Sequence, residues 1–372
     1  MSAPRRRRAA LRLLAATAAL PLLALTACGY GSESDDDGDD AAPAARGEKI
    51  GGLDEIRLGF FPNVTHATPL AGLDDAGPLT AELAGTRVKP QVFNAGPAAV
   101  EALNAGSVDM TWLGPSPALN GFTQADGRNL RIVSGATSGG ASLVVDPDKI
   151  TSTDDLGGKR IATPSLGNTQ DVALLNYLAA EGFEVDPRSG EGEVSVIRQD
   201  NKEIPTSFQQ GSLDGAWVPE PTASTVVAKG GRVLVDERDL WDGGKFVTTH
   251  LAVSQSFLEE HPDVVEAVVR GSVKTNAWIN EHPDEAKARI NDALAEYGGK
   301  ELPEDVLASA FEAIEATDDP LAATLREQAE HSVASGLLDK VRTDGIYDLS
   351  LLNKVLEAEG RPAIDDAGLG VE

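Results

Sequence analysis

The chain repeats a short motif within itself, and this repeat limits the folds that the sequence can adopt. The segment GSVDMTWLGP, which starts at Gly106, matches GSLDGAWVPEP, which starts at Gly211. Earlier in each half, a strand-like run leads into a polar corner, PNVTHA around Asn63 and SLGNTQD around Asn168. Both matches have one offset, since 217 − 112 = 105 for the tryptophans and 168 − 63 = 105 for the asparagines. Two matches at one offset indicate a duplicated architecture, with a period too long for a solenoid.

The duplicated part alternates strand-like and helix-like segments. IRLGFF, VDMTWL, KRIATP and DGAWV are typical of strands, and PAAVEALNAG, QDVALLNYLAAEG and EIPTSFQQG are typical of helices. This alternation predicts two α/β lobes. Ligands of open α/β sheets bind at the carboxyl ends of the strands, so two facing lobes predict a shared cleft. After about residue 250 amphipathic helices prevail, with prolines at their starts at Pro262, Pro283, Pro303 and Pro320.

Each polar corner places short polar side chains at the start of an expected helix. The first helical turn has unpaired N–H donors and a partial positive charge, so it can bind an anion without a formal cation. In the second corner, Asn168 or Thr169 is a candidate N-cap, and Asp171 stands at the capping-box distance from Asn168. Gly167 lets a ligand approach the backbone closely. Ligand binding is the hypothesis for these residues, and helix capping is the alternative.

The N-terminus has the pattern of an export signal. A basic region at residues 5–12 precedes the run LLAATAALPLLALTA, which is short and interrupted by a proline, as in a secretory signal rather than a membrane-spanning helix. The run ends in LTACG, which resembles the lipobox of bacterial lipoproteins. We therefore expect residues 1–27 to be a lipoprotein signal peptide and Cys28, the only cysteine, to carry the lipid. Residues 28–50 are acidic and poor in apolar side chains, which predicts a disordered tether.

Composition and motifs argue against several other functions. The formal net charge of −27 argues against nucleic acid as a partner, because nucleic acid binds basic surfaces. The sequence contains no Walker, Rossmann, H-E-x-x-H or EF-hand spacing, and its five histidines lack metal-ligand spacing. GPSPA, from Gly114, only approaches the nucleophile elbow G-x-S-x-G, because its last residue is alanine. We therefore expect no catalytic residue, no cofactor and no metal.

Four segments together resemble the ABC-transporter substrate-binding proteins of the aliphatic sulfonate, taurine and nitrate group. They are FPNVTHA after a strand, FNAGPAAVEALNAGSVDMTWLGPSPAL, DLGGKRIATPSLGNTQDVAL and GSLDGAWVPEP, and the resemblance covers roughly residues 54–290. It implies a type II periplasmic-binding-protein fold, with a ligand cleft between two α/β lobes joined by two crossover strands near ASLVV and VTTHLAV. By this analogy residues 51–145 plus 248–372 form lobe I, with the C-terminal helices packed on it, and residues 146–247 form lobe II.

The resemblance also implies which residues contact the ligand. Besides Gly167, they are Asn63, Thr65, His66, Ser116, Asn168, Thr169, Gln170, Trp217 and Glu220. None of the four loops contains Lys or Arg, so amides, hydroxyls and helix N-termini would hold a bound sulfonate. Three assignments stay open: His66 as a hydrogen-bonded surface residue, Trp217 as a core residue, and Glu220 as a hinge residue, the partner of a cation or a contact for an amine.

The predicted function is therefore that of an extracytoplasmic solute-binding lipoprotein of an ABC importer, anchored to the cell membrane by its lipid. Its ligand would be a small organosulfur anion, an aliphatic sulfonate or a sulfate ester, which a closing cleft delivers to the membrane permease subunits. The expected oligomeric state is a monomer. The alternatives are taurine, nitrate or a thiamine-pyrimidine precursor as the ligand, or an enzyme on the same fold, since relatives of this fold include pyrimidine-precursor synthases.

Overall fold

The computed structural model of the chain describes residues 49–83 and 85–371. The described residues all belong to one compact unit. The predicted signal peptide, Cys28 and the predicted tether up to residue 48 lie outside the described residues. Among the described residues, no helix has both the length and the apolar composition that a membrane span requires.

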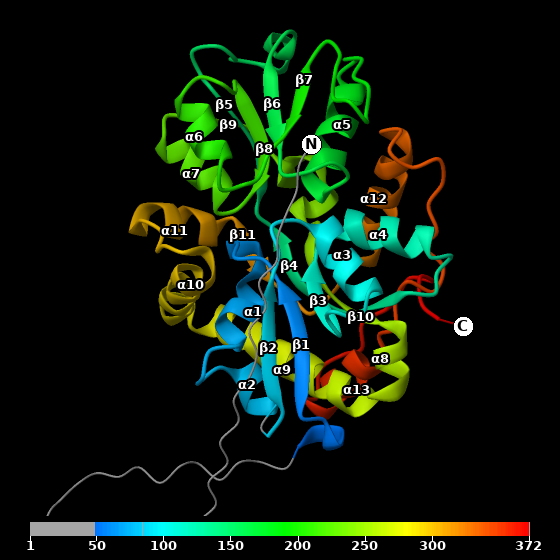
Figure 1. Cartoon of the computed structure of the whole chain (residues 1–372). Helices are drawn as coiled ribbons and strands as arrows, with labels where there is room; N and C mark the ends of the chain where they lie inside the picture. The colour runs from blue at the N-terminus through cyan, green and yellow to red at the C-terminus, as the bar shows by residue number, and fades with distance from the viewer. Residues whose placement is uncertain (1–48, 84, 372) are drawn as a thin grey trace, which may run out of the picture. The chain divides into compact units, whose positions relative to one another are not determined.

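The first sheet joins strands from both ends of the described chain (Figure 1). Its strands are β1 (Glu55–Phe60), β2 (Arg87–Val92), β3 (Met110–Leu113), β4 (Leu130–Gly139), β10 (Val247–Ser254) and β11 (Ile314–Ala316). They lie in the order β11-β4-β10-β3-β1-β2. β1 is parallel to β2 and β3, whereas β10 is antiparallel to β3 and β4. The polar corner after β1 and the loop after β3 therefore emerge at the same edge of the sheet.

The second sheet has the same central arrangement. Its strands are β5 (Ala141–Val145), β6 (Arg160–Thr163), β7 (Ser195–Arg198), β8 (Gly215–Pro219) and β9 (Arg232–Asp236), in the order β7-β6-β8-β5-β9. β6 is parallel to β7 and β8, as β1 is parallel to β2 and β3. β5 is antiparallel to β8 and β9. The polar corner after β6 and the loop after β8 share one edge, so the equivalence predicted from the sequence holds in the strand pairing.

Helices cover both sheets. Around the first sheet lie α1 (Ala67–Gly72), α2 (Pro78–Glu82), α3 (Gly96–Asn104), α4 (Pro115–Gln124), α8 (Gln255–Glu260), α9 (Pro262–Glu281), α10 (Pro283–Gly298) and α13 (Ser350–Ala358). Around the second lie α5 (Thr169–Ala180), α6 (Ile204–Gln209) and α7 (Thr222–Ala228). All five side chains of β5 are buried, and they alternate: Leu143 packs with the α5 side and Val144 with the α6 and α7 side. A strand with helices on both faces is expected to be apolar throughout.

A pair of ion pairs explains the repeated motif. In the first sheet the Arg57 backbone N–H and Nε both donate to Asp109 Oδ2, at 2.7 and 3.1 Å. In the second sheet the Arg160 backbone N–H and Nε donate to Asp214 Oδ2, at 3.0 and 3.1 Å. Each arginine also donates to the carbonyl of the glycine that opens the motif. The aspartate of GSVD and GSLD therefore ties its own strand to the neighbouring strand of the sheet, β3 to β1 and β8 to β6.

The chain crosses between the sheets twice. It leaves the first sheet at Gly139 and enters the second at Ala141, through Gly139 and Gly140, whose φ angles of +78° and +77° favour glycine. It returns between the end of β9 and Val247. The boundary expected from the sequence lies after residue 145, but β5 pairs within the second sheet. The Gly139-Gly140 pair directly before β5 is the sequence signal that could have marked the earlier crossing.

Two C-terminal helices lie beside both sheets, α11 (Glu304–Glu312) and α12 (Ala322–Ala334). α11 contacts α7 of the second sheet as well as α10 and β11. α12 contacts α4 of the first sheet and α5 of the second (Figure 1). The expectation that the C-terminal helices pack on the first lobe is right for α9, α10 and α13. For α11 and α12 it is incomplete, because these two helices bridge the sheets at either side.

Candidate functional site

The second polar corner is a rigid helix start. Asn168 is the N-cap of α5, and its side-chain oxygen accepts a hydrogen bond from the Gln170 backbone N–H at 2.9 Å. Asp171 is fully buried, pairs with Arg198 Nε at 2.9 Å, and accepts from the Gly167 backbone N–H at 3.0 Å. In a capping box the Asp171 carboxylate would accept from the backbone N–H of Asn168. Here it accepts instead from the backbone N–H of the residue before, Gly167. Side chains already paired in this way hold the first turn of α5 in a fixed position.

The N-terminal turns of α4 and α5 meet between the two sheets. Gly114 is the N-cap of α4, and a Cβ atom placed on it would lie 2.3 Å from Thr169 Oγ1. Ser116 is 3% exposed and Thr169 is 5% exposed. Neither Ser116 Oγ nor Thr169 Oγ1 has a hydrogen-bond partner within the described residues. A buried hydroxyl without a hydrogen-bond partner destabilises the folded protein unless a ligand or a water molecule bonds to it. Each of these two hydroxyls also lies at a helix start, where the helix dipole favours negative charge.

The first polar corner contributes a neutral imidazole. His66 is 2% exposed, its ring packs on Phe61 with centroids 4.4 Å apart, and the Phe61 backbone N–H donates to its Nδ1 at 3.4 Å. Burial lowers the pKa of His66 to about 3, so the ring is neutral at physiological pH. With Nδ1 as the acceptor, Nε2 carries the proton and can donate a hydrogen bond. The Thr65 carbonyl accepts from Thr249 Oγ1 at 2.9 Å, which fixes this corner to β10.

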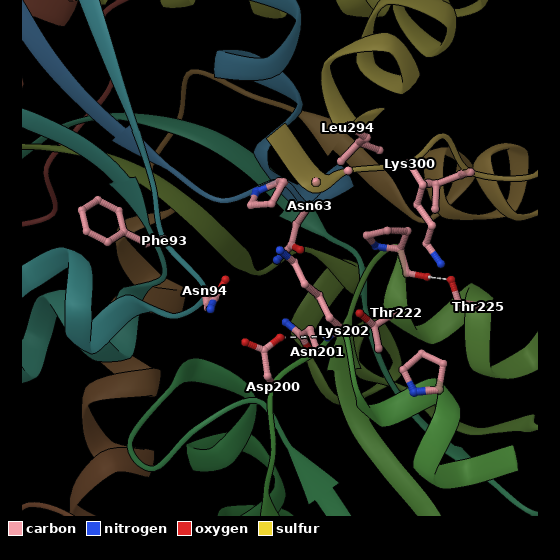
Figure 2. Close-up of a pocket in the computed structure, with 16 residues that line it drawn as sticks. Asn63, Phe93, Asn94, Asp200, Asn201, Lys202, Thr222, Thr225, Leu294 and Lys300 are labelled. Carbon is pink, nitrogen blue, oxygen red and sulfur yellow. Dashed lines mark hydrogen bonds between the residues drawn. The ribbon is translucent and has the colours of Figure 1, made fainter. Parts of the chain in front are cut away.

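A cavity of about 290 Å³ lies between loops of the two sheets (Figure 2). Its walls come from the corner after β1, the loop after β2, the loop after β7, the start of α7 and the end of α10. They include Pro62, Asn63, Phe93, Asn94, Asp200, Asn201, Lys202, Pro205, Thr222, Thr225 and Lys300. Asn63 is the one predicted site residue among those that line it. Asn94 and Asn201 are not among the predicted site residues, although each follows a strand of a parallel pair, and this position is the signal that could have identified them.

A second cavity of about 300 Å³ opens on the other side of the same interface, where α12 passes the sheets. Ser116 and Gly167 line it together with Pro97, Asn120, Leu166 and Arg188. Residues 93–97 thus contribute to both cavities, Phe93 and Asn94 to the first and Pro97 to the second. The contact between Gly114 and Thr169 lies in this same interface. The structure therefore brings Asn63, Ser116, Gly167 and Thr169 to one interface between the sheets.

Trp217 and Glu220 are placed elsewhere. Trp217 is fully buried in the core, its ring packs on Tyr177, and its Nε1 donates to Glu237 Oε2 at 2.7 Å. This is the core position that the sequence left open as an alternative. Glu220 follows β8, its backbone N–H donates to the Gly140 carbonyl at 2.9 Å, and its carboxylate accepts from the Ser224 backbone N–H and hydroxyl. Burial raises the pKa of Glu220 to about 7. The hydrogen bond to Gly140 places this residue next to the first crossing between the sheets.

No group of three or more histidine, cysteine, aspartate or glutamate side chains in the described part of the chain has the geometry to hold a metal ion. At the two helix starts the polar groups are hydroxyls, amides and backbone N–H groups, whereas charged side chains, among them Asp200, Lys202, Lys300 and Arg188, line the cavities on either side. The groups at the helix starts can donate hydrogen bonds to an anion.

Two mixed sheets, joined by two crossings and facing each other across loops at their strand ends, define the type II periplasmic-binding-protein fold. Solved structures agree with this class. The alkanesulfonate-binding protein SsuA from Xanthomonas axonopodis pv. citri, bound to MOPS, has a TM-score of 0.62 at 23% identity, over 77% of this chain and 94% of that one. The periplasmic nitrate-binding protein NrtA from Synechocystis PCC 6803 has a TM-score of 0.66 at 15% identity, over 82% of this chain and 89% of that one.

Residues 51–295 match the NMT1-like family, and the chain belongs to this family. The taurine-binding periplasmic protein of Escherichia coli (strain K12) is 29% identical over 220 residues, which is 59% of this chain. The chain spans 66% of the length of that relative. A protein of Bacillus subtilis (strain 168), provisionally named as binding aliphatic sulfonates, is 27% identical over 82% of this chain and 89% of its own length. The resemblance stated from the sequence is confirmed.

Proposed function

We propose that the chain is the extracytoplasmic solute-binding protein of an ABC importer, and that it carries a small organosulfur anion, an aliphatic sulfonate or a sulfate ester. The coarser part rests on the family. The named relatives are solute-binding proteins, so we assign the chain as a solute-binding protein and not as an enzyme. The finer part, the ligand class, rests on the site. In this proposal the permease subunits are the partners that receive the ligand.

One observation carries the ligand class: Ser116 Oγ and Thr169 Oγ1 are buried, without partners, at the starts of two helices from different sheets. A sulfonate or sulfate oxygen between them would accept both hydroxyl hydrogens and face the positive ends of two helix dipoles. His66 Nε2, which carries the proton, is a third candidate donor. Hydrogen bonds to a charged group are each worth about 1.5–3 kcal/mol, so a few of them bind an anion without a buried cation.

We further propose two lobes, with the first sheet and its helices as lobe I and the second sheet as lobe II. The ligand would bind to both lobes in the closed form, and opening about the glycine pair at 139 and 140 would release it. Because Thr169 belongs to lobe II and Ser116 to lobe I, an anion that binds both hydroxyls stabilises the closed form alone. The remaining predicted contacts, Asn63, Thr65, Asn168 and Gln170, would position these donors or line the path to them.

The lipid anchor is also part of the proposal. Cys28 would hold the folded chain at the extracytoplasmic face of the cell membrane, with the acidic segment that follows it as a spacer. This placement agrees with a role next to a permease. A monomer would suffice for it, since the site proposed here draws on one chain.

Isothermal calorimetry of the purified protein tests the ligand class. The panel contains alkanesulfonates, taurine, a sulfate ester, nitrate and a pyrimidine. We expect heat and thermal stabilisation with sulfonates or sulfate esters, and weaker binding of nitrate, which is too small to reach all the donors. Binding of the pyrimidine alone would overturn the anion proposal, and chemical turnover of any compound would overturn the assignment as a binding protein.

A further inference from the structure

The cavity between the sheets contains positive charge that the buried hydroxyls do not explain. Lys202 follows β7 of the second sheet, and Lys300 follows α10, which packs on α1 of the first. Both line the 290 Å³ cavity. In Figure 2 the side chains of Lys202 and Asn63 point toward each other, and Lys300 points toward Thr225 from another wall. Each lobe therefore contributes one lysine to the cavity.

Neither ammonium group is neutralised by the protein. Within the described residues, no ion pair or side-chain hydrogen bond involves Lys202 Nζ or Lys300 Nζ, although the chain contains 59 acidic residues. Asp200 is the one acidic residue in the cavity wall, and its carboxylate accepts the Lys202 backbone N–H at 2.9 Å. The wall thus has two positive charges and one negative charge, in a chain whose formal net charge is −27.

Two like charges that line one cavity repel each other when the lobes close. An acidic group between them would remove this repulsion and gain attraction to both. The cavity also offers side-chain amide N–H donors, from Asn63 and Asn94. Its volume is close to the lower end of the range of about 300–1,000 Å³ that is usual for small-molecule sites. There is room for more of a ligand than its sulfonate.

We infer that the ligand has a second acidic group, and that Lys202 and Lys300 bind it in this outer cavity. This inference rests on the proposed function: the sulfonate or sulfate would occupy the helix starts, and its organic part would extend past residues 93–97 to the lysines. The preferred substrate class is then a dianionic sulfonate or sulfate ester, for example one with a terminal carboxylate. A ligand with a terminal ammonium group, such as taurine, would be repelled.

Three compounds of one length separate these possibilities: 3-sulfopropanoate, propane-1-sulfonate and taurine, which end in a carboxylate, a methyl and an ammonium group. We expect the purified protein to bind them in that order of decreasing affinity. Because both lysines are solvent-exposed, each should contribute at most about fivefold. The preference should shrink as salt is raised from 50 to 500 mM, since screening weakens exposed charges.

The variant Lys202→Met/Lys300→Met provides the direct test, with Lys89→Met/Lys229→Met as a control of equal charge. Lys89 lies on β2 and Lys229 at the end of α7, and neither lines the cavity. We expect the first double variant to lose the preference for 3-sulfopropanoate while its affinity for propane-1-sulfonate is unchanged. The control should keep the order of the native protein.

The outcomes distinguish the two proposals. If propane-1-sulfonate binds but the order of the three ligands is unaffected by Lys202→Met/Lys300→Met, the inference about a second acidic group is wrong and the proposed function stands. Preference for taurine in the native protein would have the same meaning. If neither these three compounds nor the sulfate ester of the calorimetric panel binds, the proposed function is wrong and the inference falls with it.

Discussion

Replacement of Gly114 by alanine should keep the lobes from closing while leaving each lobe intact. A Cβ atom at this position would lie 2.3 Å from Thr169 Oγ1, whereas ordinary contacts begin at 3.4 Å. The lobes would have to separate by about 3.4 − 2.3 = 1.1 Å at this point. The backbone of Gly114, with φ −73° and ψ 159°, is open to any residue, so the substitution introduces no strain within lobe I.

The expected cost follows from the size of the overlap. Forcing a methyl group into a packed contact costs about 1–3 kcal/mol. Because the clash exists only in the closed form, this cost weakens ligand binding by roughly five- to 150-fold. Calorimetry with propane-1-sulfonate measures the affinity, and small-angle X-ray scattering with and without the ligand measures the compaction on closure. The melting temperature of the unliganded protein should not change, since opening relieves the clash.

Two further variants sharpen the test. Gly157→Ala is the control, because its Cβ would meet only Phe183 at 3.8 Å. In Gly114→Ala/Thr169→Ala the overlapping hydroxyl is gone, so ligand-induced compaction should return and the affinity should match that of Thr169→Ala alone. This is the non-additivity expected of residues in direct contact. Native affinity in Gly114→Ala, or a fall in the melting temperature of the unliganded variant, would refute the reasoning.

Four other outcomes follow from the site and its supports. Thr169→Ala should weaken sulfonate binding by about 1.5–3 kcal/mol in calorimetry at an unchanged melting temperature, and an unchanged affinity would remove Thr169 from the site. Burial alone would raise the pKa of Asp214, but hydrogen bonds from Arg160 and Lys149 outweigh it and hold the pKa at about 2, below the ordinary 3.8. Its contribution to stability, up to about 2 kcal/mol, is therefore present above pH 4 and lost as the pH falls toward 2, and chemical unfolding of Asp214→Asn should lack this part of the pH dependence. Burial raises the pKa of Glu237 to about 7, so the folded protein should lose stability as the pH rises from about 4.5 through 7, and Glu237→Gln should flatten that slope. Cys28→Ser should move the protein from the membrane fraction to the medium in cell fractionation, and retention at the membrane would contradict the lipid anchor.

The duplicated architecture could be predicted from the sequence because its markers are local. The aspartates at 109 and 214 lie 105 residues apart, and so do the two polar corners. The arginines that pair with these aspartates escaped notice, since 160 − 57 = 103, and a comparison at an offset of 105 misses them. The physical reason for the motif, a charge pair between neighbouring strands, needed the strand pairing to become visible.

The candidate site was only partly predictable, for a similar reason. The polar corners were found because helix starts and strand ends have sequence signals, and Ser116 and Thr169 stand there. Lys300 has no such signal: it enters the cavity because α10 folds back on α1, more than 200 residues earlier in the chain. The contacts of α11 and α12 with helices of both sheets depend on the same long-range packing, which hydrophobic periodicity does not encode. The sequence around Trp217 does not show whether its side chain packs in the core or lines the cleft, because both places suit a tryptophan that follows a strand start.

The division between a neutral inner site and charged outer walls has an energetic logic. A lysine or arginine among the buried hydroxyls would have to lose its water in the empty protein, at a cost of several kcal/mol. Hydroxyls and helix starts carry no such cost, and they still favour an anion. Lys202 and Lys300 are exposed, so they keep their water until the ligand arrives. Buried donors would then supply most of the affinity, while the exposed lysines would select among anions and promote closure only when the ligand is acidic enough.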